Sequence, residues 1–143
     1  MPSSYVSNYV HVVFSTKGRA RLIPADVESE LWAYLAGIAE NHGVQPVSIG
    51  GMADHVHALI NLGPILNIAK AAQVLKANSS RWMKEKGNKG FEWQEGYFAC
   101  SVSQSQVPVV VRYVQNQKEH HRKIDSAGEF ALLLKRHGLV VRE

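Results

Sequence analysis

Residues 44–62 read VQPVSIGGMADHVHALINL, and this stretch decides the fold. Its two ends, residues 44–49 and 53–62, are rich in β-branched and apolar residues and predict two strands. Between them, Gly50 and Gly51 permit a sharp turn. The sequence therefore predicts a β-hairpin with its turn at the glycine pair.

The segments on either side of the hairpin alternate between extended and helical patterns. Residues 9–14 (YVHVVF) and residues 96–103 predict strands, and residues 25–41 predict an amphipathic helix capped by Asp26. A second helix follows from Asn67. The resulting order, βαββαβ, is the ferredoxin-like arrangement: an α+β sandwich in which helices cover one face of an antiparallel sheet.

A further helix is expected after the last strand, with Ser105 as its cap and Pro108 in its first turn. The residues of this helix expected to be buried are Val107, Val110, Val111 and Val114. The tail, residues 125–143, contains Phe130, Leu133, Leu134 and Leu139 and predicts one short docking helix rather than a disordered end. We expect residues 1–143 to form a single domain with a C-terminal tyrosine-bearing helix.

The composition restricts the class of protein. A chain of 143 residues with 45% hydrophobic residues can bury one sizeable core. Lys and Arg number 16 against 12 Asp and Glu, and this excess of positive charge favours an anionic partner. Cys100 is the single cysteine, so an intramolecular disulfide is excluded. No signal-peptide pattern and no apolar run of roughly 20 residues is present, so we expect a cytosolic protein without a membrane partner.

His55 and His57 are the first candidate site. Residues two apart on a strand point to the same face, so both imidazoles can lie side by side while Val56 points to the other layer. Imidazole suits transition-metal ions, and two such ligands leave coordination positions free for substrate oxygens. A lone His-x-His pair is more often two polar positions on the wet face of a strand.

Tyr113 and Gln117 are the second candidate site. At 100° per residue they lie with His120 in one narrow sector of the predicted helix, beside the valines. Such a tyrosine is more often a core-boundary residue with its hydroxyl in water. If it acts on phosphate, however, it needs a cation to neutralise the phosphate oxygens and to lower its own pKa, which is about 10 when unperturbed. The two histidines with the Gln117 amide oxygen would hold that cation.

Four separated motifs together resemble a known family. They are HVVFSTK (residues 11–17), GMADHVH (51–57), WQEGY (93–97) and RYVQNQ (112–117), the last followed by His120 and His121. In this order they closely resemble the HUH single-tyrosine transposases of the insertion-sequence-200-like group. That group includes the transposases associated with repetitive extragenic palindromes.

The resemblance implies a ferredoxin-like fold, a homodimer formed by joined sheets, and cleavage and rejoining of single-stranded DNA at hairpins near the element ends. It implies that His55 and His57 bind Mg²⁺ or Mn²⁺, that Gln117 completes the metal site, and that Tyr113 is the nucleophile. In such dimers the tyrosine helix of one subunit can complete the site of the other. No nucleotide cofactor is implied, because one phosphodiester is exchanged for another.

DNA contacts are expected from basic residues outside the chemistry. The candidates are Lys17, Arg19 and Arg21 in the first loop, Lys76, Arg81 and Lys84 on the second helix, and Arg112 and Arg122 around the third. They form a channel only if they share one face.

Two other functions compete with transposition. A domesticated or non-catalytic protein that binds hairpins would use the same basic residues without chemistry. A structural zinc protein is disfavoured because such sites normally present four ligands, and Cys100 is the single thiolate available.

Overall fold

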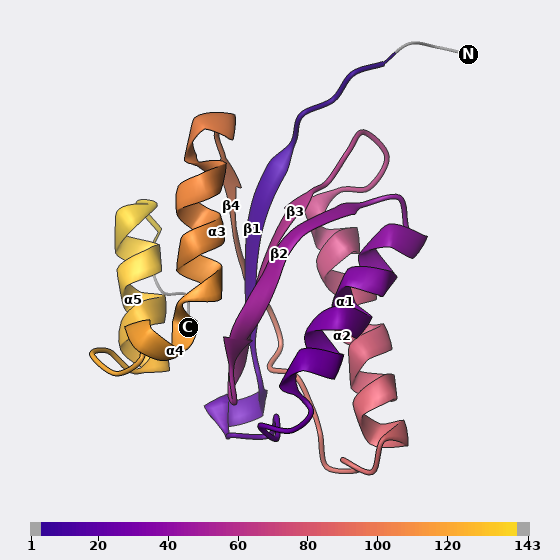
Figure 1. Ribbon diagram of the computed structural model, residues 1–143, viewed down its shortest axis with the longest axis vertical. Coiled ribbons are helices and arrows are strands. Elements are labelled where there is room, and N and C mark those ends of the chain that lie inside the picture. The colour runs from indigo at the N-terminus through magenta and orange to yellow at the C-terminus, as the bar shows by residue number, and fades with distance from the viewer. Residues whose placement is uncertain (1–3, 140–143) are drawn as a thin grey trace.

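The computed structural model describes residues 4–139, and its elements follow the predicted order (Figure 1). The strands and helices of the βαββαβ unit are β1 (Tyr9–Ser15), α1 (Glu28–Asn41), β2 (Gln45–Met52), β3 (His55–Asn61), α2 (Ile68–Glu85) and β4 (Phe98–Val102). Three helices follow: α3 (Val107–Gln115), α4 (Gln117–His120) and α5 (Ser126–Arg136). Short 3₁₀ turns, η1 (Lys17–Arg19) and η2 (Gln104–Gln106), precede α1 and α3.

The four strands form one antiparallel sheet in the order β2-β3-β1-β4. In its register, His57 of β3 lies opposite Val13 of β1 on one side and Gly50 of β2 on the other. Every residue of β3 from His55 to Ile60 is buried, as expected for an interior strand covered on both faces. The predicted ferredoxin-like α+β fold is confirmed.

Helices cover both faces of the sheet (Figure 1). Helices α1 and α2 pack on the face that carries Val12, Val56 and Ala58, and these residues belong to the main hydrophobic core. Helices α3, α4 and α5 lie on the opposite face, to which the histidines of β3 point. The two-layer sandwich is thus extended to three layers by the C-terminal helices.

The predicted turn at Gly50 and Gly51 is wrong. Strand β2 continues through both glycines, which pair with His57 and Val56, and the turn lies at residues 53–54. The reason for a glycine at position 50 is a close approach of α3. A Cβ at Gly50 would lie 2.7 Å from the carbonyl oxygen of Val114.

Both predicted side-chain caps are also wrong. Asp26 lies in a turn, closed by the Val27 N–H donating to the Pro24 carbonyl, and α1 begins only at Glu28. Ser105 lies inside η2, which runs directly into α3. The residue before α3 is Gln106, and α3 has no side-chain capping hydrogen bond. Pro108 lies in the first turn as predicted. Of the four valines expected to be buried, Val114 alone is fully buried, since α3 meets the sheet along a narrow line.

The tail forms the predicted docking helix. Helix α5 is capped by Asp125, whose carboxylate accepts the Gly128 N–H at 2.7 Å. Leu133 packs with Val13 and Phe98 in a small second cluster on the α3 side of the sheet. Within residues 4–139, none of the helices combines the length and the apolar character that crossing a membrane requires.

We expect Gly50→Ala to lower the free energy of unfolding by about 1–3 kcal/mol, because the added methyl group forces α3 away from β2. Gly37→Ala is the matched control. Gly37 lies in α1 with no neighbour within 4 Å of a built Cβ, so this change should raise stability by about 0.5–1 kcal/mol. Urea unfolding measures both, and equal stability of Gly50→Ala and wild type would contradict the tight α3 contact.

Candidate functional site

Strand β3 presents His55 and His57 beneath α3, α4 and α5. Their side chains are 2% and 0% exposed, and their ring centroids lie 5.0 Å apart. The wet-face interpretation of the His-x-His pair therefore does not apply here, because both imidazoles are buried. Buried imidazoles need polar partners, and these come from four other segments of the chain.

Tyr113 and Gln117 reach the histidines from one kinked helical segment. Helix α3 ends at Gln115, and α4 begins at Gln117, where the His120 N–H donates to the Asn116 carbonyl at 2.9 Å. Gln117 is 1% exposed, and its Oε1 lies 3.0 Å from His55 Nε2. The Tyr113 ring stands edge-on to His57 at 5.4 Å between centroids. One chain thus brings all four predicted residues together.

Glu129 of α5 lies at the centre of this group, and the sequence analysis missed it. Its Oε1 is 3.1 Å from the Nε2 atoms of both His55 and His57 and 3.2 Å from that of His121. Its other oxygen, Oε2, accepts a hydrogen bond from the Tyr113 hydroxyl. The signal for this residue was present in the sequence, because Glu129 lies one turn before the buried Leu133 and so shares the buried face of the tail helix.

The outer nitrogens of both histidines are also engaged. Asp54 Oδ1 lies 2.7 Å from His55 Nδ1, and Ser126 donates its hydroxyl to the same carboxylate. His11 of β1 shares a 2.8 Å hydrogen bond between its Nε2 and His57 Nδ1. With both Nδ1 atoms occupied, both Nε2 atoms converge on one point. This is the usual arrangement around metal-binding histidines.

The charges of the group are strongly coupled. Burial favours neutral His55, but its bonds to Asp54 and Glu129 outweigh burial and raise its pKa to about 9. Burial lowers the pKa of His57, and burial with the neighbouring His57 lowers the pKa of His11 to about 3. Burial and the Glu129 carboxylate raise the pKa of Tyr113, so the phenol keeps its proton in this state.

The donor set fits a divalent metal ion. One ligand atom each from His55, His121 and Glu129 lies within 4.8 Å of the others. Imidazole nitrogens with carboxylate and amide oxygens suit ions such as Mn²⁺ and Zn²⁺, and the oxygens alone suit Mg²⁺. This group overlaps the predicted ligands at His55 and adds two residues from the C-terminal segments.

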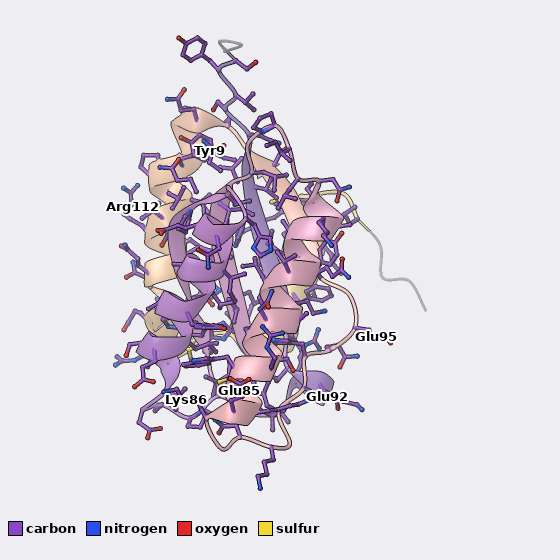
Figure 2. All side chains as sticks on the ribbon, turned by 90° about the vertical axis from the view of Figure 1, so that its right-hand side faces the viewer. Tyr9, Glu85, Lys86, Glu92, Glu95 and Arg112 are labelled. Atoms are coloured by element: carbon purple, nitrogen blue, oxygen red, sulfur yellow. The ribbon has the colours of Figure 1, made fainter. Side chains whose placement is uncertain are left out.

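The predicted DNA contacts on α2 and those around α3 lie on opposite sides of the sheet. Figure 2 shows Arg112 on α3 and the end of α2, marked by Glu85 and Lys86, well apart. Members of the α2 group are Lys76, whose Nζ donates to the carbonyls of Gln94 and Gly96, Arg81 and the exposed Lys84. On the other side, Arg112 and Arg122 are exposed beside the Tyr113 segment. The eight residues therefore do not form one channel.

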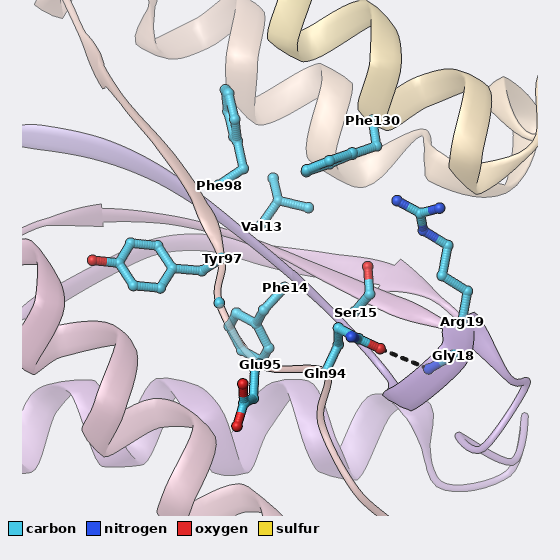
Figure 3. A pocket seen from close by; sticks show the side chains of 11 residues that line it. Val13, Phe14, Ser15, Gly18, Arg19, Gln94, Glu95, Tyr97, Phe98 and Phe130 are labelled. Atoms are coloured by element: carbon cyan, nitrogen blue, oxygen red, sulfur yellow. Dashed lines mark hydrogen bonds between the residues drawn. The ribbon is translucent and has the colours of Figure 1, made fainter. Parts of the chain in front are cut away.

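Of the three first-loop cations, Arg21 lies beside the histidine site. Arg21 lines a cavity of about 170 Å³ with Asp54 and His121, and Lys17 pairs with Glu92 at 3.2 Å. Arg19 places its guanidinium 5.2 Å from the centre of the Phe130 ring. Figure 3 shows Arg19 and Phe130 at one end of a larger open cavity of about 500 Å³. Its lining combines aromatic and polar side chains, among them Tyr97, Phe98, Gln94 and Glu95.

Comparisons with known proteins agree on one family. The model of the family described as "Transposase IS200 like" matches residues 4–117 of this chain. The ISDra2 transposase TnpA of Deinococcus radiodurans is 28% identical over 116 residues, which are 76% of this chain and 83% of that protein. The transposase for insertion sequence element IS200 of Salmonella typhimurium is 24% identical over 83% of this chain and 80% of its own length.

Two solved structures share the fold. A crystal structure of a candidate transposase from Deinococcus radiodurans has a TM-score of 0.62 and 27% identity, covering 82% of this chain and 96% of that one. A REP-associated tyrosine transposase bound to a REP hairpin also has a TM-score of 0.62, at 11% identity, over 87% of this chain and 74% of that one. At 11% identity the second likeness concerns the fold alone.

We expect the metal-free protein to lose stability as the pH rises from 7.5 to 9. The pKa of His55 is about 9 in the fold against 6.5 unfolded, so its contribution is complete below pH 6.5 and disappears as the pH reaches 9. The loss over this window should be about 2 kcal/mol. Urea unfolding in EDTA measures it. Asp54→Asn removes the negative charge beside His55 Nδ1 and should flatten the slope, and equal slopes for both proteins would contradict the assignment.

Proposed function

Because the chain belongs to the IS200-like transposase family, as its four motifs predict, we propose that it is a metal-dependent transposase that binds hairpins in single-stranded DNA. In this proposal it cleaves and rejoins strands through a 5′-phosphotyrosine. The observation that carries the proposal is the convergence of Tyr113 and Gln117 on His55 and His57 within one chain. The hairpin bound to the REP-associated relative supports the choice of substrate.

The chemistry exchanges one ester for another. The Tyr113 oxygen attacks a backbone phosphorus, the bond from phosphorus to the 3′ oxygen breaks, and the 3′-OH leaves with a proton. A 3′-OH from a second strand reverses the step and joins new ends without ATP. We propose that His55, His57 and Gln117 hold Mg²⁺ or Mn²⁺, which supplies charge stabilisation at a non-bridging phosphate oxygen. The protein aligns the phenol with the phosphate, and alignment itself lowers the barrier.

A complete site within one chain bears on the oligomer. The family resemblance implies a homodimer, and we retain that expectation. Since Tyr113 lies against the histidines of its own chain, we propose that each chain can cleave with its own tyrosine in this arrangement.

Tyr113→Phe should abolish the covalent protein–DNA adduct, because phenylalanine has no oxygen to attack phosphorus. The assay is a denaturing gel with labelled single-stranded hairpin DNA from the element flanks, in Mn²⁺ or in EDTA. Tyr34→Phe is the matched control, because Tyr34 stacks on Trp82 among the residues packed against the α1 and α2 core. Tight DNA binding by wild type without any adduct would favour the non-catalytic hairpin binder.

Arg19→Ala should weaken binding of a short unpaired oligonucleotide that spans the cleavage site, because Arg19 lies against Phe130, the residue after Glu129 on α5, and lines the larger open cavity. Loss of one phosphate contact lowers the log–log salt slope by about 0.7 for a single strand. Arg81→Ala is the control, because the Arg81 guanidinium binds Asn78 on α2. This change should leave binding of the short oligonucleotide unchanged and should weaken binding only of DNA long enough to pass around the sheet. Fluorescence anisotropy at several salt concentrations measures both, and an unchanged Arg19→Ala slope would remove Arg19 from the contacts.

A further inference from the structure

Glu129 is one of the site residues that the family match does not reach. The match ends at Gln117, whereas Glu129 lies on α5 and is 3% exposed. A buried carboxylate is costly unless it is paired and hydrogen-bonded. Here the partners are the Nε2 atoms of His55, His57 and His121, that of His120 at 3.4 Å, and the hydroxyl of Tyr113.

We propose that Glu129 is a ligand of the metal ion held by His55 and His57, and that metal binding therefore fixes α5 on the site. The inference rests on the proposed function, because it concerns the same ion. It adds to the predicted ligands His55, His57 and Gln117 a carboxylate that comes from the C-terminal segment of this chain.

The chemistry of the ligands supports this assignment. Two imidazoles and an amide are neutral, and hard cations such as Mg²⁺ and Mn²⁺ prefer carboxylate oxygens. Glu129 Oε1 occupies the point on which three Nε2 atoms converge within 3.1–3.2 Å. The Glu129 carboxylate and the imidazole nitrogens can all donate electron pairs. A divalent ion bound among them would supply the positive charge that such ligands favour.

The two oxygens of the Glu129 carboxylate have different partners, and this gives Glu129 a second role. While Oε1 faces the imidazoles, Oε2 accepts the hydrogen bond from Tyr113. One carboxylate therefore sets the position of the tyrosine hydroxyl relative to the ligand nitrogens. Toward Tyr113, Glu129 acts as a positioning residue.

The fold links this ligand to a whole helix. Ser126, in the first turn of α5, binds Asp54, the partner of His55, and Leu133 packs against the sheet. Glu129 lies between these two anchors on the same helix. Holding Glu129 through a metal ion should therefore slow the local opening of α5.

The first test is calorimetric titration of the metal-free full-length protein with Mn²⁺. Glu129→Gln should bind Mn²⁺ at least about tenfold more weakly than wild type. Glu119→Gln is the matched control, since Glu119 lies on α4 with its carboxylate on the exposed Arg122, and it should bind as wild type does. Thermal unfolding in EDTA checks that each variant is folded, and Glu129→Asp, which keeps the charge on a shorter side chain, serves if Glu129→Gln is not. It too should bind Mn²⁺ more weakly than wild type.

The second test is amide hydrogen exchange of wild type with and without Mn²⁺. Exchange in α5 should slow when Mn²⁺ is present, and equal exchange would overturn the proposed link. Unchanged Mn²⁺ affinity in a folded Glu129 variant would overturn the ligand assignment. If that variant also formed the adduct faster, Glu129 would instead be an internal anion that occupies the place of the phosphate. Tyr113→Phe should keep its Mn²⁺ affinity, because metal binding does not depend on strand cleavage. A wild-type protein that binds Mn²⁺ but forms no adduct would therefore contradict the transposase function and leave the ligand test intact.

Discussion

The structure depends on the two-sided burial of strand β3. Its alternate residues Val56, Ala58 and Ile60 pack in the core beneath α1 and α2, while His55 and His57 face the C-terminal helices. Because side chains alternate with a period of two, a slip of one residue would place the imidazoles in the hydrophobic core and the valine in the site. The hydrophobic core therefore fixes the register of the sheet, and the register fixes the position of the two histidines in the site.

Much of this could be read from the sequence, because it depends on local periodicity. The alternation in β3, the helical spacing in α1 and the Tyr113–Gln117 step are local patterns, and the structure bears them out. Gly50 shows where local reading fails. A glycine pair between two strands is typical of a turn, but here it accommodates the backbone of α3. That requirement comes from a segment more than 60 residues later in the chain, so no local pattern carries it.

Glu129 and the His11 contact were missed for a related reason. His11 on β1 meets His57 only because the two strands are neighbours in the sheet, and Glu129 meets the histidines only because α5 docks over them. The sequence predicts that α5 docks, and even that Glu129 shares a face with Leu133, but it does not predict against what. An acidic residue on the buried face of a terminal helix is the clue that a polar site lies beneath it.

The limits of the family match divide the site into two parts. His55, His57, Tyr113 and Gln117 lie within the matched residues 4–117, whereas His121, Ser126 and Glu129 lie beyond them. The first part contains the proposed nucleophile and the proposed neutral ligands. The second part brings the carboxylate that faces the centre of the imidazoles, together with the hydroxyl that steadies Asp54. The charge balance of the buried centre is consequently decided by a helix that the matched region does not include.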